Sequence, residues 1–262
     1  MKISIIMAVF NGEKYVSKAI RSILNQTYQD FEFIIIEDGS LDKSLEIVKE
    51  YAKKDNRIKI IRNDINIGLT KCLNKAINLA NGIFIARQDV DDISLPKRLE
   101  YQITFLSNNP DYSFCGCNGI SKQTRQTLVN SFNNDEIKKN LILKNCFAHP
   151  SIIIRKEVFK KYGLYNEKYL YAQDYELWCR FIYKYRLKAK NLRDRLIIMN
   201  MPFERLLEKD NYKFLTQTKN KIKTKLKYFR YCDIKFRVLI SIFNDLIEFY
   251  YVLIFKGYKR VK

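Results

Sequence analysis

The first 92 residues alternate between short apolar runs and segments whose apolar residues recur at helical spacing. A continuous apolar run rich in β-branched residues is typical of a buried strand, and apolar residues three or four positions apart are typical of an amphipathic helix. The strand-like runs cover residues 3–10, 31–36, 58–61 and 83–86, and the helical patterns cover residues 16–24, 41–52 and 69–80. This order requires right-handed crossovers, so it predicts an α/β fold with a mostly parallel central sheet and helices on both faces.

Polar residues follow three of these four predicted strands. They are Asn11 and Glu13 after the first strand, Asp38 after the second, and Asp89, Asp91 and Asp92 after the fourth. The carboxyl ends of parallel strands lie at one edge of the sheet, where ligands bind in open α/β folds. Asp89 and Asp91 can face one divalent cation, and such hard oxygen ligands suit Mg²⁺ or Mn²⁺ bridging phosphates. The pattern predicts a site for a metal and a diphosphate, and the alternative is an acidic surface loop.

The rest of the first 200 residues predicts a second half of the same domain. Helices are expected at 96–107, at 136–143 and from Asp174 onward, strands at 112–120, 151–154 and 196–199, and a tyrosine-rich loop at 163–172. We therefore expect one domain over residues 1–200, with a nucleotide-binding half (1–92) and an acceptor-side half (93–200). Residues 201–262 form a helical C-terminal extension.

Positive charge is concentrated toward the end of the chain. The formal net charge is +20, and residues 186–262 hold 20 Lys or Arg against 7 Asp or Glu, a net of +13. This asymmetry predicts an anionic partner for the C-terminal part, either a membrane surface or a nucleic acid.

The extension contains an amphipathic pattern over residues 236–255. Its polar residues form one narrow stripe, made of Arg237, Ser241, Asn244, Asp245 and Glu248. Charged residues interrupt the apolar run, so a membrane-spanning helix is not expected. A wide apolar face with basic flanks instead predicts a helix that lies on an anionic membrane surface. The alternative is a helix packed on the catalytic body or on a second subunit, and in the latter case the protein would be an oligomer.

Cysteine and histidine usage argues against a structural zinc site or a disulfide framework. The six cysteines form no CxxC pair, and His149 is the only histidine. The chain enters a strand pattern at once, without a signal peptide. We expect a cytoplasmic protein with reduced thiols, held peripherally on the inner face of the plasma membrane.

Ordered motifs across residues 1–200 resemble glycosyltransferase family 2. They are Val9–Tyr15, Ser22–Tyr28, Glu37–Ser40, the DxD-containing segment Ala86–Asp92, His149–Ser151 and Gln173–Trp178. The resemblance implies the GT-A fold, a nucleotide-sugar donor with UDP as the favoured nucleotide, a divalent metal (Mn²⁺ or Mg²⁺), and inversion at the anomeric carbon.

The resemblance also implies roles for residues near the nucleotide. Ala8, Val9, Phe10 and Glu13 would line the base pocket, largely through their backbone. Asp38 would accept a hydrogen bond from the base.

The remaining implied roles concern the metal and the proton transfer. Asp89 would contact the ribose, Asp91 would hold the metal, and His149 is a further candidate for contact with the metal or a phosphate. Asp174 would be the general base that takes the proton of the acceptor hydroxyl. Its pKa would need to be raised by burial, which the aromatic loop at 165–171 could supply.

Each assignment has a structural alternative. Asp174 could be a helix N-cap, Asp38 a turn residue, Asn11 a helix cap (the interpretation we favour for Asn11), Asp92 the cap of the following turn, His149 a buried structural histidine, and Arg87 a partner of Asp89, of Asp91 or of a phosphate. The sequence alone does not choose among these.

Three positions depart from the family pattern. Ala8 replaces a common proline, Phe10 replaces the usual tyrosine and so lacks its hydroxyl, and Gln173 stands where the family often has Glu. Gln173 removes a neighbouring charge from Asp174 but leaves the proposed base in place.

The expected function is that of a metal-dependent hexosyl- or N-acetylhexosaminyl-transferase. Its acceptor would be a saccharide or a lipid-linked saccharide in surface polysaccharide synthesis. One rival is a non-catalytic nucleotide-sugar-binding partner subunit, against which the intact Asp91 and Asp174 argue. The other is a basic nucleic-acid-binding protein, but the chain has no recognised motif for it, so we expect no nucleic-acid partner.

Overall fold

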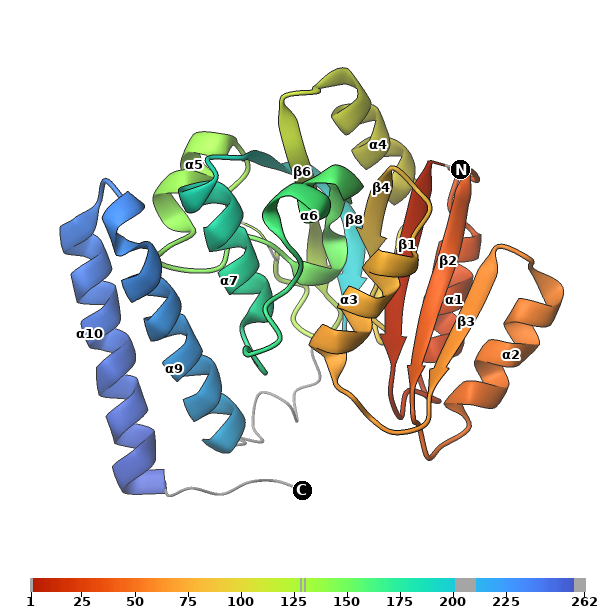
Figure 1. Cartoon of the computed structure of the whole chain (residues 1–262), viewed down its shortest axis with the longest axis horizontal. Coiled ribbons are helices and arrows are strands. Elements are labelled where there is room, and N and C mark those ends of the chain that lie inside the picture. Colours follow the sequence, from red (N-terminus) through yellow and green to blue (C-terminus); the bar gives the residue numbers. More distant parts are fainter. Residues whose placement is uncertain (1, 128, 130, 201–210, 257–262) are drawn as a thin grey trace.

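One mixed β-sheet runs through the protein, with helices on both of its faces (Figure 1). The computed structural model describes residues 2–127, 129, 131–200 and 211–256. In this part of the chain eight strands follow the spatial order β3-β2-β1-β4-β7-β6-β8-β5. The strands are β1 (Ile3–Val9), β2 (Phe31–Asp38), β3 (Ile58–Asn63), β4 (Phe84–Arg87), β5 (Ile93–Ser94), β6 (Tyr112–Ser121), β7 (Ile153–Arg155) and β8 (Lys188–Met199).

The α-helices alternate with the strands in the first half of the chain and form the C-terminal extension at its end. They are α1 (Val16–Leu24), α2 (Ser44–Lys54), α3 (Leu69–Leu79), α4 (Arg98–Asn108), α5 (Asn134–Asn140), α6 (Lys156–Tyr162), α7 (Gln173–Cys179), α9 (Asn211–Tyr228) and α10 (Lys235–Tyr251).

Strands β1 to β4 form the parallel half of the sheet, as predicted. β1 lies between β2 and β4 and is parallel to both, and β3 lies outside β2. The register pairs Ile5 with Phe33 on one side and with Ala86 on the other. Because the four strands run in the same direction, the loops that follow them share one edge of the sheet.

Both faces of this half are buried, which explains the continuous apolar runs in the sequence. Successive strand residues point to opposite faces. Ile5 and Met7 pack in a cluster with residues of α1, α2 and α4. Ile6 packs on the opposite face, in a cluster that contains residues of α3 and α7.

The second half of the sheet differs from the prediction in three places. β7 is antiparallel to β4 and β6 and begins at Ile153, because His149–Ser151 forms a 3-10 turn. β8 is twelve residues long rather than four and runs parallel to β6. Its first half buries Ala189 and Asn191, which give no apolar pattern. The short strand β5, antiparallel to β8, was not predicted.

Residues 211–256, the described part of the C-terminal extension, pack on the second half of the domain as a helical hairpin. In Figure 1, α9 lies beside α7, and α10 lies on the outside of α9. Tyr228, Cys232, Val238 and Ile242 join the hydrophobic cluster that contains α7. Among the described residues, every helix is too short or too polar to cross a lipid bilayer.

Candidate active site

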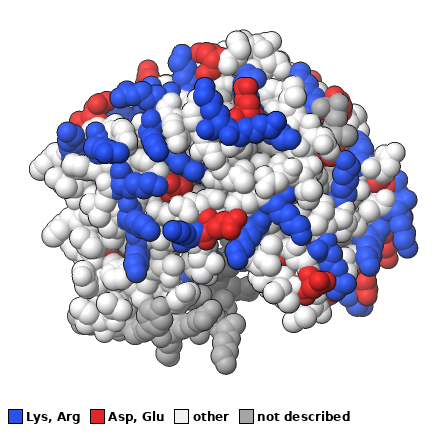
Figure 2. Space-filling view, in the orientation of Figure 1, with Lys and Arg blue, Asp and Glu red and all other residues white. Residues whose placement is uncertain are grey.

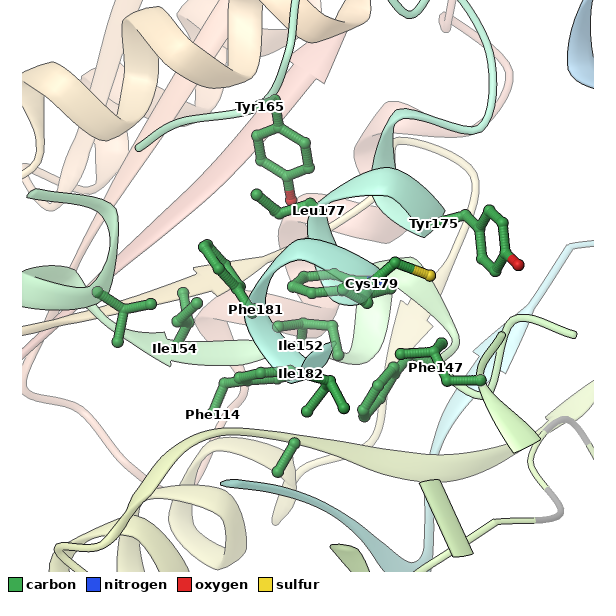
Figure 3. Close-up of a cluster of buried hydrophobic side chains, with 14 of the residues drawn as sticks. Phe114, Phe147, Ile152, Ile154, Tyr165, Tyr175, Leu177, Cys179, Phe181 and Ile182 are labelled. Carbon is green, nitrogen blue, oxygen red and sulfur yellow. The ribbon is translucent and has the colours of Figure 1, made fainter. Parts of the chain in front are cut away.

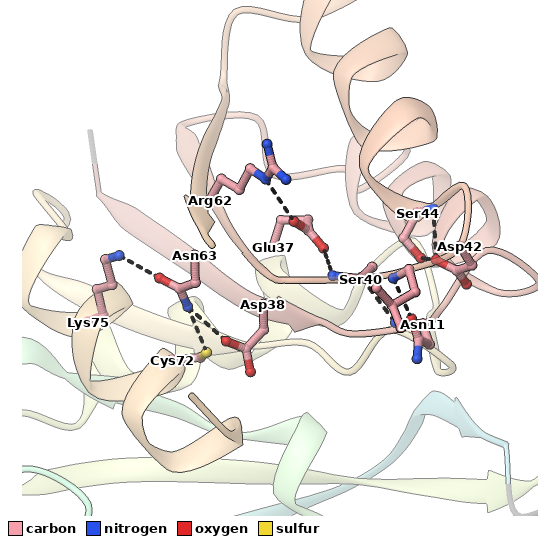
Figure 4. Close-up of polar contacts among 11 residues, drawn as sticks. Asn11, Glu37, Asp38, Ser40, Asp42, Ser44, Arg62, Asn63, Cys72 and Lys75 are labelled. Carbon is pink, nitrogen blue, oxygen red and sulfur yellow. Dashed lines mark hydrogen bonds and ion pairs between the residues drawn. The ribbon is translucent and has the colours of Figure 1, made fainter. Parts of the chain in front are cut away.

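The loops after β1 and β2 are fastened together at the carboxyl edge of the sheet (Figure 4). The Asn11 backbone N–H donates to Ser40 Oγ (3.1 Å), and the Leu41 N–H donates to Asn11 Oδ1 (2.9 Å). Asn11 has a φ of 49°, in the left-handed region that asparagine tolerates. Helix α1 begins after Tyr15, so the expectation that Asn11 caps a helix is wrong. Its side chain joins two loops of the site.

The residues expected around the nucleotide base lie at the end of β1 and in the loop after it. Val9 is buried and Ala8 is partly buried, whereas 46% of Phe10 is exposed. An exposed aromatic ring at this edge suits stacking on a planar base. Glu13 Oε2 accepts a hydrogen bond from the Lys43 N–H (3.1 Å) at the start of α2. One carboxylate oxygen of Glu13 therefore holds the loop after β1 against α2.

Asp38 ends β2 with a buried carboxylate whose oxygens both have protein donors. Oδ1 accepts from Asn63 Nδ2 (2.8 Å) and from the Ile67 N–H (2.9 Å), and Oδ2 accepts from the Gly68 N–H (3.0 Å). Asp38 therefore holds the start of α3. An ionised carboxylate has about four acceptor sites, so one remains for a nucleotide base.

The acidic turn after β4 is held by a buried polar network that the sequence did not reveal. Gln88 Nε2 donates to the carbonyls of Asp89 and Asp92, both at 2.9 Å. Arg98, fully buried in α4, donates to Gln88 Oε1 (3.1 Å) and to the Arg87 carbonyl (2.6 Å). These contacts fix the backbone of the turn, so its carboxylates project from a rigid frame.

Arg87 forms an ion pair with Asp89 across 2.6 Å, which resolves one alternative left open by the sequence. The Arg87 side chain is almost fully buried, and its Nε and Nη1 have no hydrogen-bond partner among the described residues. Buried donors without a partner are rare because they lose hydration without replacement. An anionic ligand at this place would supply the acceptors that these two nitrogens lack.

Asp92 and Asp91 occupy different environments. Asp92 is 2% exposed, and its Oδ1 accepts from the Asn200 N–H (2.8 Å), which ties the turn to the end of β8. The side chain of Asp92 therefore contacts the end of β8, and not the following turn as the alternative for Asp92 had it. Burial, and then the charges of Asp89 and Asp91, raise the pKa of Asp92 to about 8. Asp91 is partly exposed at a small cavity of about 60 Å³.

These acids suit a divalent cation. Burial raises the pKa of Asp89, the Arg87 charge opposes this rise, and the Asp91 charge adds to it. A cation would stabilise such crowded carboxylates in their ionised form. No group of three or more His, Cys, Asp or Glu is placed to hold a metal in the described part of the chain. Any further ligands would be oxygens of the donor and water, as Mg²⁺ commonly uses.

Asp174 is the second residue of α7. It lies near the acidic turn, since its charge adds to the effect of burial in raising the pKa of Asp89. Its Oδ2 accepts from Asn145 Nδ2 (2.8 Å), a partner not found from the sequence. The N-cap of α7 is Ala172, with a φ of 58°, so the alternative in which Asp174 is the N-cap is wrong. Burial raises the pKa of Asp174, as expected, and hydrogen bonds and the charge of Arg87 partly oppose the rise.

Helix α7 is a rigid support for Asp174. Figure 3 shows Leu177, Cys179 and Phe181 of this region within an apolar cluster. Trp178 stacks on Phe114 with ring centroids 5.1 Å apart. The base candidate therefore stands on a packed helix rather than on a loop, which limits its movement.

His149 lies near Arg87 and Tyr165. Its Nε2 is 2.8 Å from Tyr165 Oη, and burial and the Arg87 charge hold its pKa well below 6.5. The imidazole is therefore neutral at neutral pH, a state that can ligate a metal. With Nε2 bound to Tyr165, contact with a metal or phosphate stays a prediction for His149.

Comparison with known sequences identifies relatives that match more than half of this chain. The model for Glycosyl transferase family 2 matches residues 4–163. The uncharacterized glycosyltransferase MJ1057 of Methanocaldococcus jannaschii is 41% identical over 190 residues, which cover 69% of this chain and 64% of that protein. The O-antigen biosynthesis glycosyltransferase WbnJ of Escherichia coli is 40% identical over 185 residues, 69% of this chain and 71% of WbnJ. The chain thus spans less than two thirds of the length of MJ1057.

Solved structures share the fold over nearly the whole chain. S. aureus TarS 1–349 in complex with UDP-GlcNAc has a TM-score of 0.71 at 20% identity, covering 95% of this chain and 73% of that chain. The mannosyltransferase PcManGT of Pyrobaculum calidifontis, in complex with GDP-Man and Mn²⁺, has a TM-score of 0.70 at 13% identity, covering 94% and 74%. At these identities the likeness shows the fold alone.

Proposed function

The chain belongs to glycosyltransferase family 2 and has the GT-A fold, and we propose that it transfers a hexosyl or N-acetylhexosaminyl group, with inversion, from a nucleoside diphosphate sugar to a saccharide hydroxyl. One observation carries the proposal. The charge of Asp174, from α7, adds to burial in raising the pKa of Asp89, and the charge of Arg87, from the end of β4, opposes the burial that raises the pKa of Asp174.

We place the donor at the loops after β1, β2 and β4. Phe10 would stack on the base, and the free acceptor site of Asp38 would bind a base N–H. Asp89 would contact the ribose, and the unpartnered N–H groups of Arg87 would donate to the diphosphate. The UDP-GlcNAc and GDP-Man complexes of the structural relatives support a nucleotide sugar as the donor, and we propose UDP as the nucleotide.

Asp91 would hold the divalent cation, because Asp89 already pairs with Arg87 and Asp92 is buried. When bound, a Mn²⁺ or Mg²⁺ ion neutralises charge that develops on the diphosphate leaving group. The protein side chains supply the remaining chemistry. Gln88 and Arg98 keep the acidic turn in position, and Arg87 orients the carboxylate of Asp89.

Asp174 would act as the general base. One of its carboxylate oxygens takes the proton of the acceptor hydroxyl, and the hydroxyl oxygen uses the released electron pair to form a bond to C1 of the sugar. The bond from C1 to the phosphate oxygen breaks on the opposite face, and its electrons leave with the nucleoside diphosphate. Asn145 holds Asp174 in place through Oδ2, so Oδ1 is the oxygen we assign to the proton.

We propose surface polysaccharide synthesis as the setting, supported by the name of WbnJ, an O-antigen biosynthesis glycosyltransferase. The direct test is a donor screen. Purified protein is incubated with UDP- and GDP-sugars, Mn²⁺ and a lipid extract as acceptor source, and released nucleoside diphosphate is measured. One donor should give release that EDTA abolishes. Donor binding without release at any acceptor would mean a non-catalytic binding protein.

We further propose that the extension holds the enzyme at an anionic membrane surface on the cytoplasmic side. Phe243 and Ile247 belong to a row of exposed apolar side chains along α10, with exposures of 63% and 54%. In Figure 2 the margin where Figure 1 places α10 is largely white, and blue side chains gather beside it, in the region of α9. A second copy would bring two basic extensions together, so we favour anionic lipid as the occupant.

A further inference from the structure

A second cavity adjoins the proposed base, Asp174, and its lining residues differ from those of the cavity at Asp91. It measures about 260 Å³, and its wall includes Asp174 and Asn145 from the body and Gln217 and Lys221 from α9. Pockets for whole drug-sized ligands measure roughly 300–1,000 Å³. This cavity therefore suits a head group with part of a sugar, rather than a complete acceptor.

Among the described residues that line the cavity, three lysines stand against two aspartates, Asp174 and Asp245, so the formal charge of the wall is positive. Lys225 is buried and pairs with Asp245 of α10 across 2.5 Å. Lys144 and Lys221 also line the cavity, and neither pairs with a carboxylate in the part of the chain that the structure describes. Two unpaired ammonium groups facing one space favour a ligand with one or more negative charges.

Helix α9 holds its side of the cavity in a fixed position. Glu176 Oε1, buried in α7, accepts hydrogen bonds from Lys227 Nζ (3.0 Å) and Tyr228 Oη (2.8 Å). Asn220 Nδ2 donates to the Tyr171 carbonyl (2.9 Å), in the loop just before α7. Lys221 on α9 and Asp174 on α7 therefore belong to helices that are packed together.

Position along the cavity suggests how an acceptor would lie in it. The donor side of Asp174 is marked by Arg87 and Asp89, so an acceptor whose hydroxyl reaches Asp174 must extend in another direction. The cavity is lined by Asp174 and also by Asp245 of α10, a helix that carries exposed apolar side chains such as Phe243.

We infer that this cavity binds a phosphate or diphosphate ester carried by the acceptor, with Lys144 and Lys221 as its charge partners. The inference rests on the proposed function and names the acceptor class: a saccharide linked through phosphate or diphosphate, as in a lipid-linked precursor. The phosphate recognition itself is the same whether the phosphate carries a lipid or is free.

The test measures binding of farnesyl diphosphate by equilibrium dialysis, with UDP and Mn²⁺ at saturation so that the donor site is filled. Farnesol and inorganic pyrophosphate serve as competitors. The double variant Lys144→Ala/Lys221→Ala should bind the probe roughly tenfold or more weakly, because charge-assisted hydrogen bonds are lost. Lys144→Arg/Lys221→Arg should retain binding. The matched control is Lys139→Ala/Lys219→Ala, which removes the same charge from exposed positions outside the cavity.

Competition by pyrophosphate would support the site as one for phosphate in general, and binding of farnesyl diphosphate alone would support a lipid phosphate. Equal competition by farnesol, an equal loss in the control variant, or no binding to the wild type would overturn the inference. Nucleoside diphosphate release from sugar donors is measured on the same preparations. Absence of release with every donor would count against the proposed function, whereas the dialysis result alone decides on the cavity.

Discussion

Arg87 lies close enough to the carboxylates of Asp89 and Asp174 for its charge to act on the pKa of both. Asp89 and Asp174 each have a raised pKa because burial disfavours the ionised form, while Arg87 favours it. Raised carboxylate pKa values near a cation are typical of sites that transfer protons or bind metals. At the scale of single residues, this cluster is the strongest evidence for catalysis.

Replacement of the proposed base gives the first prediction. Asp174→Asn keeps the size of the side chain but cannot take a proton, so turnover of a productive donor and acceptor should fall about 10²–10⁴-fold. Steady-state release of nucleoside diphosphate measures this, and donor affinity should change little. Asp111→Asn, which removes an exposed carboxylate paired with Lys188, is the control. Unchanged turnover in Asp174→Asn would remove Asp174 from the base role.

Asp92 gives a prediction about pH and stability. Its folded-state pKa of about 8 lies above the ordinary 3.8, so proton binding stabilises the folded state. This stabilisation is complete below 3.8 and is lost as the pH rises toward 8. In EDTA, the thermal midpoint of the wild type should therefore fall between pH 5 and pH 8 more steeply than that of Asp92→Asn. Parallel curves for the two proteins would show that Asp92 does not titrate in this way.

At the scale of elements, α7 links the catalytic body to the extension. Glu176 lies on α7 two positions after Asp174 and accepts hydrogen bonds from two residues of α9, Lys227 and Tyr228. The aromatic packing of Trp178 holds the other side of α7. The position of Asp174 therefore depends on packing from both the body and α9.

Removing one of these links should loosen the extension. Tyr228→Phe deletes the hydroxyl that donates to buried Glu176, and leaving such an acceptor short of a donor costs about 1–3 kcal/mol. Urea unfolding followed by circular dichroism measures the free energy of unfolding. Tyr250→Phe, at a residue 55% exposed on α10, is the matched control and should be neutral. Equal stability of both variants would mean that α9 is held by other contacts.

At the scale of the whole molecule, the extension combines two surfaces. Its inner residues belong to the main hydrophobic cluster, so it is packed on the body as one sequence-based alternative required. Its outer face exposes apolar side chains beside a basic helix, as the membrane alternative required. Packing on the body is therefore confirmed for the inner side, and membrane binding of the outer side stays a prediction.

The outer face gives a prediction on membrane binding. Burying one isoleucine at an interface contributes about 1.5–3 kcal/mol, so Ile247→Asp should weaken binding to vesicles roughly tenfold or more. Co-sedimentation with vesicles of equal phosphatidylglycerol and phosphatidylcholine measures this, and wild-type binding should weaken as salt increases. Ile83→Asp, at a residue 60% exposed before β4, is the control. A wild-type dimer that Ile247→Asp converts to a monomer would instead assign the face to a second subunit.

Features set by local pattern were predictable from the sequence. The strands of residues 1–92 follow from continuous apolar runs and the helices from a period of 3.6 residues, and parallel pairing then places Asp38 and Asp89 at one edge. The first half of β8 was missed because Ala189 and Asn191 are buried without an apolar run. That strand is stabilised by its pairing with β6, a contact that no local pattern records.

By itself, the sequence determined the fold class, the parallel half of the sheet and the edge at which the acids gather, because burial periodicity and chain direction are local properties. Only the tertiary structure decided that Arg87 pairs with Asp89, that Asn145 holds Asp174, and which face of α10 remains exposed. These are contacts between segments far apart in the chain, and their energies depend on distance and burial. Those two quantities exist only once the segments have packed together.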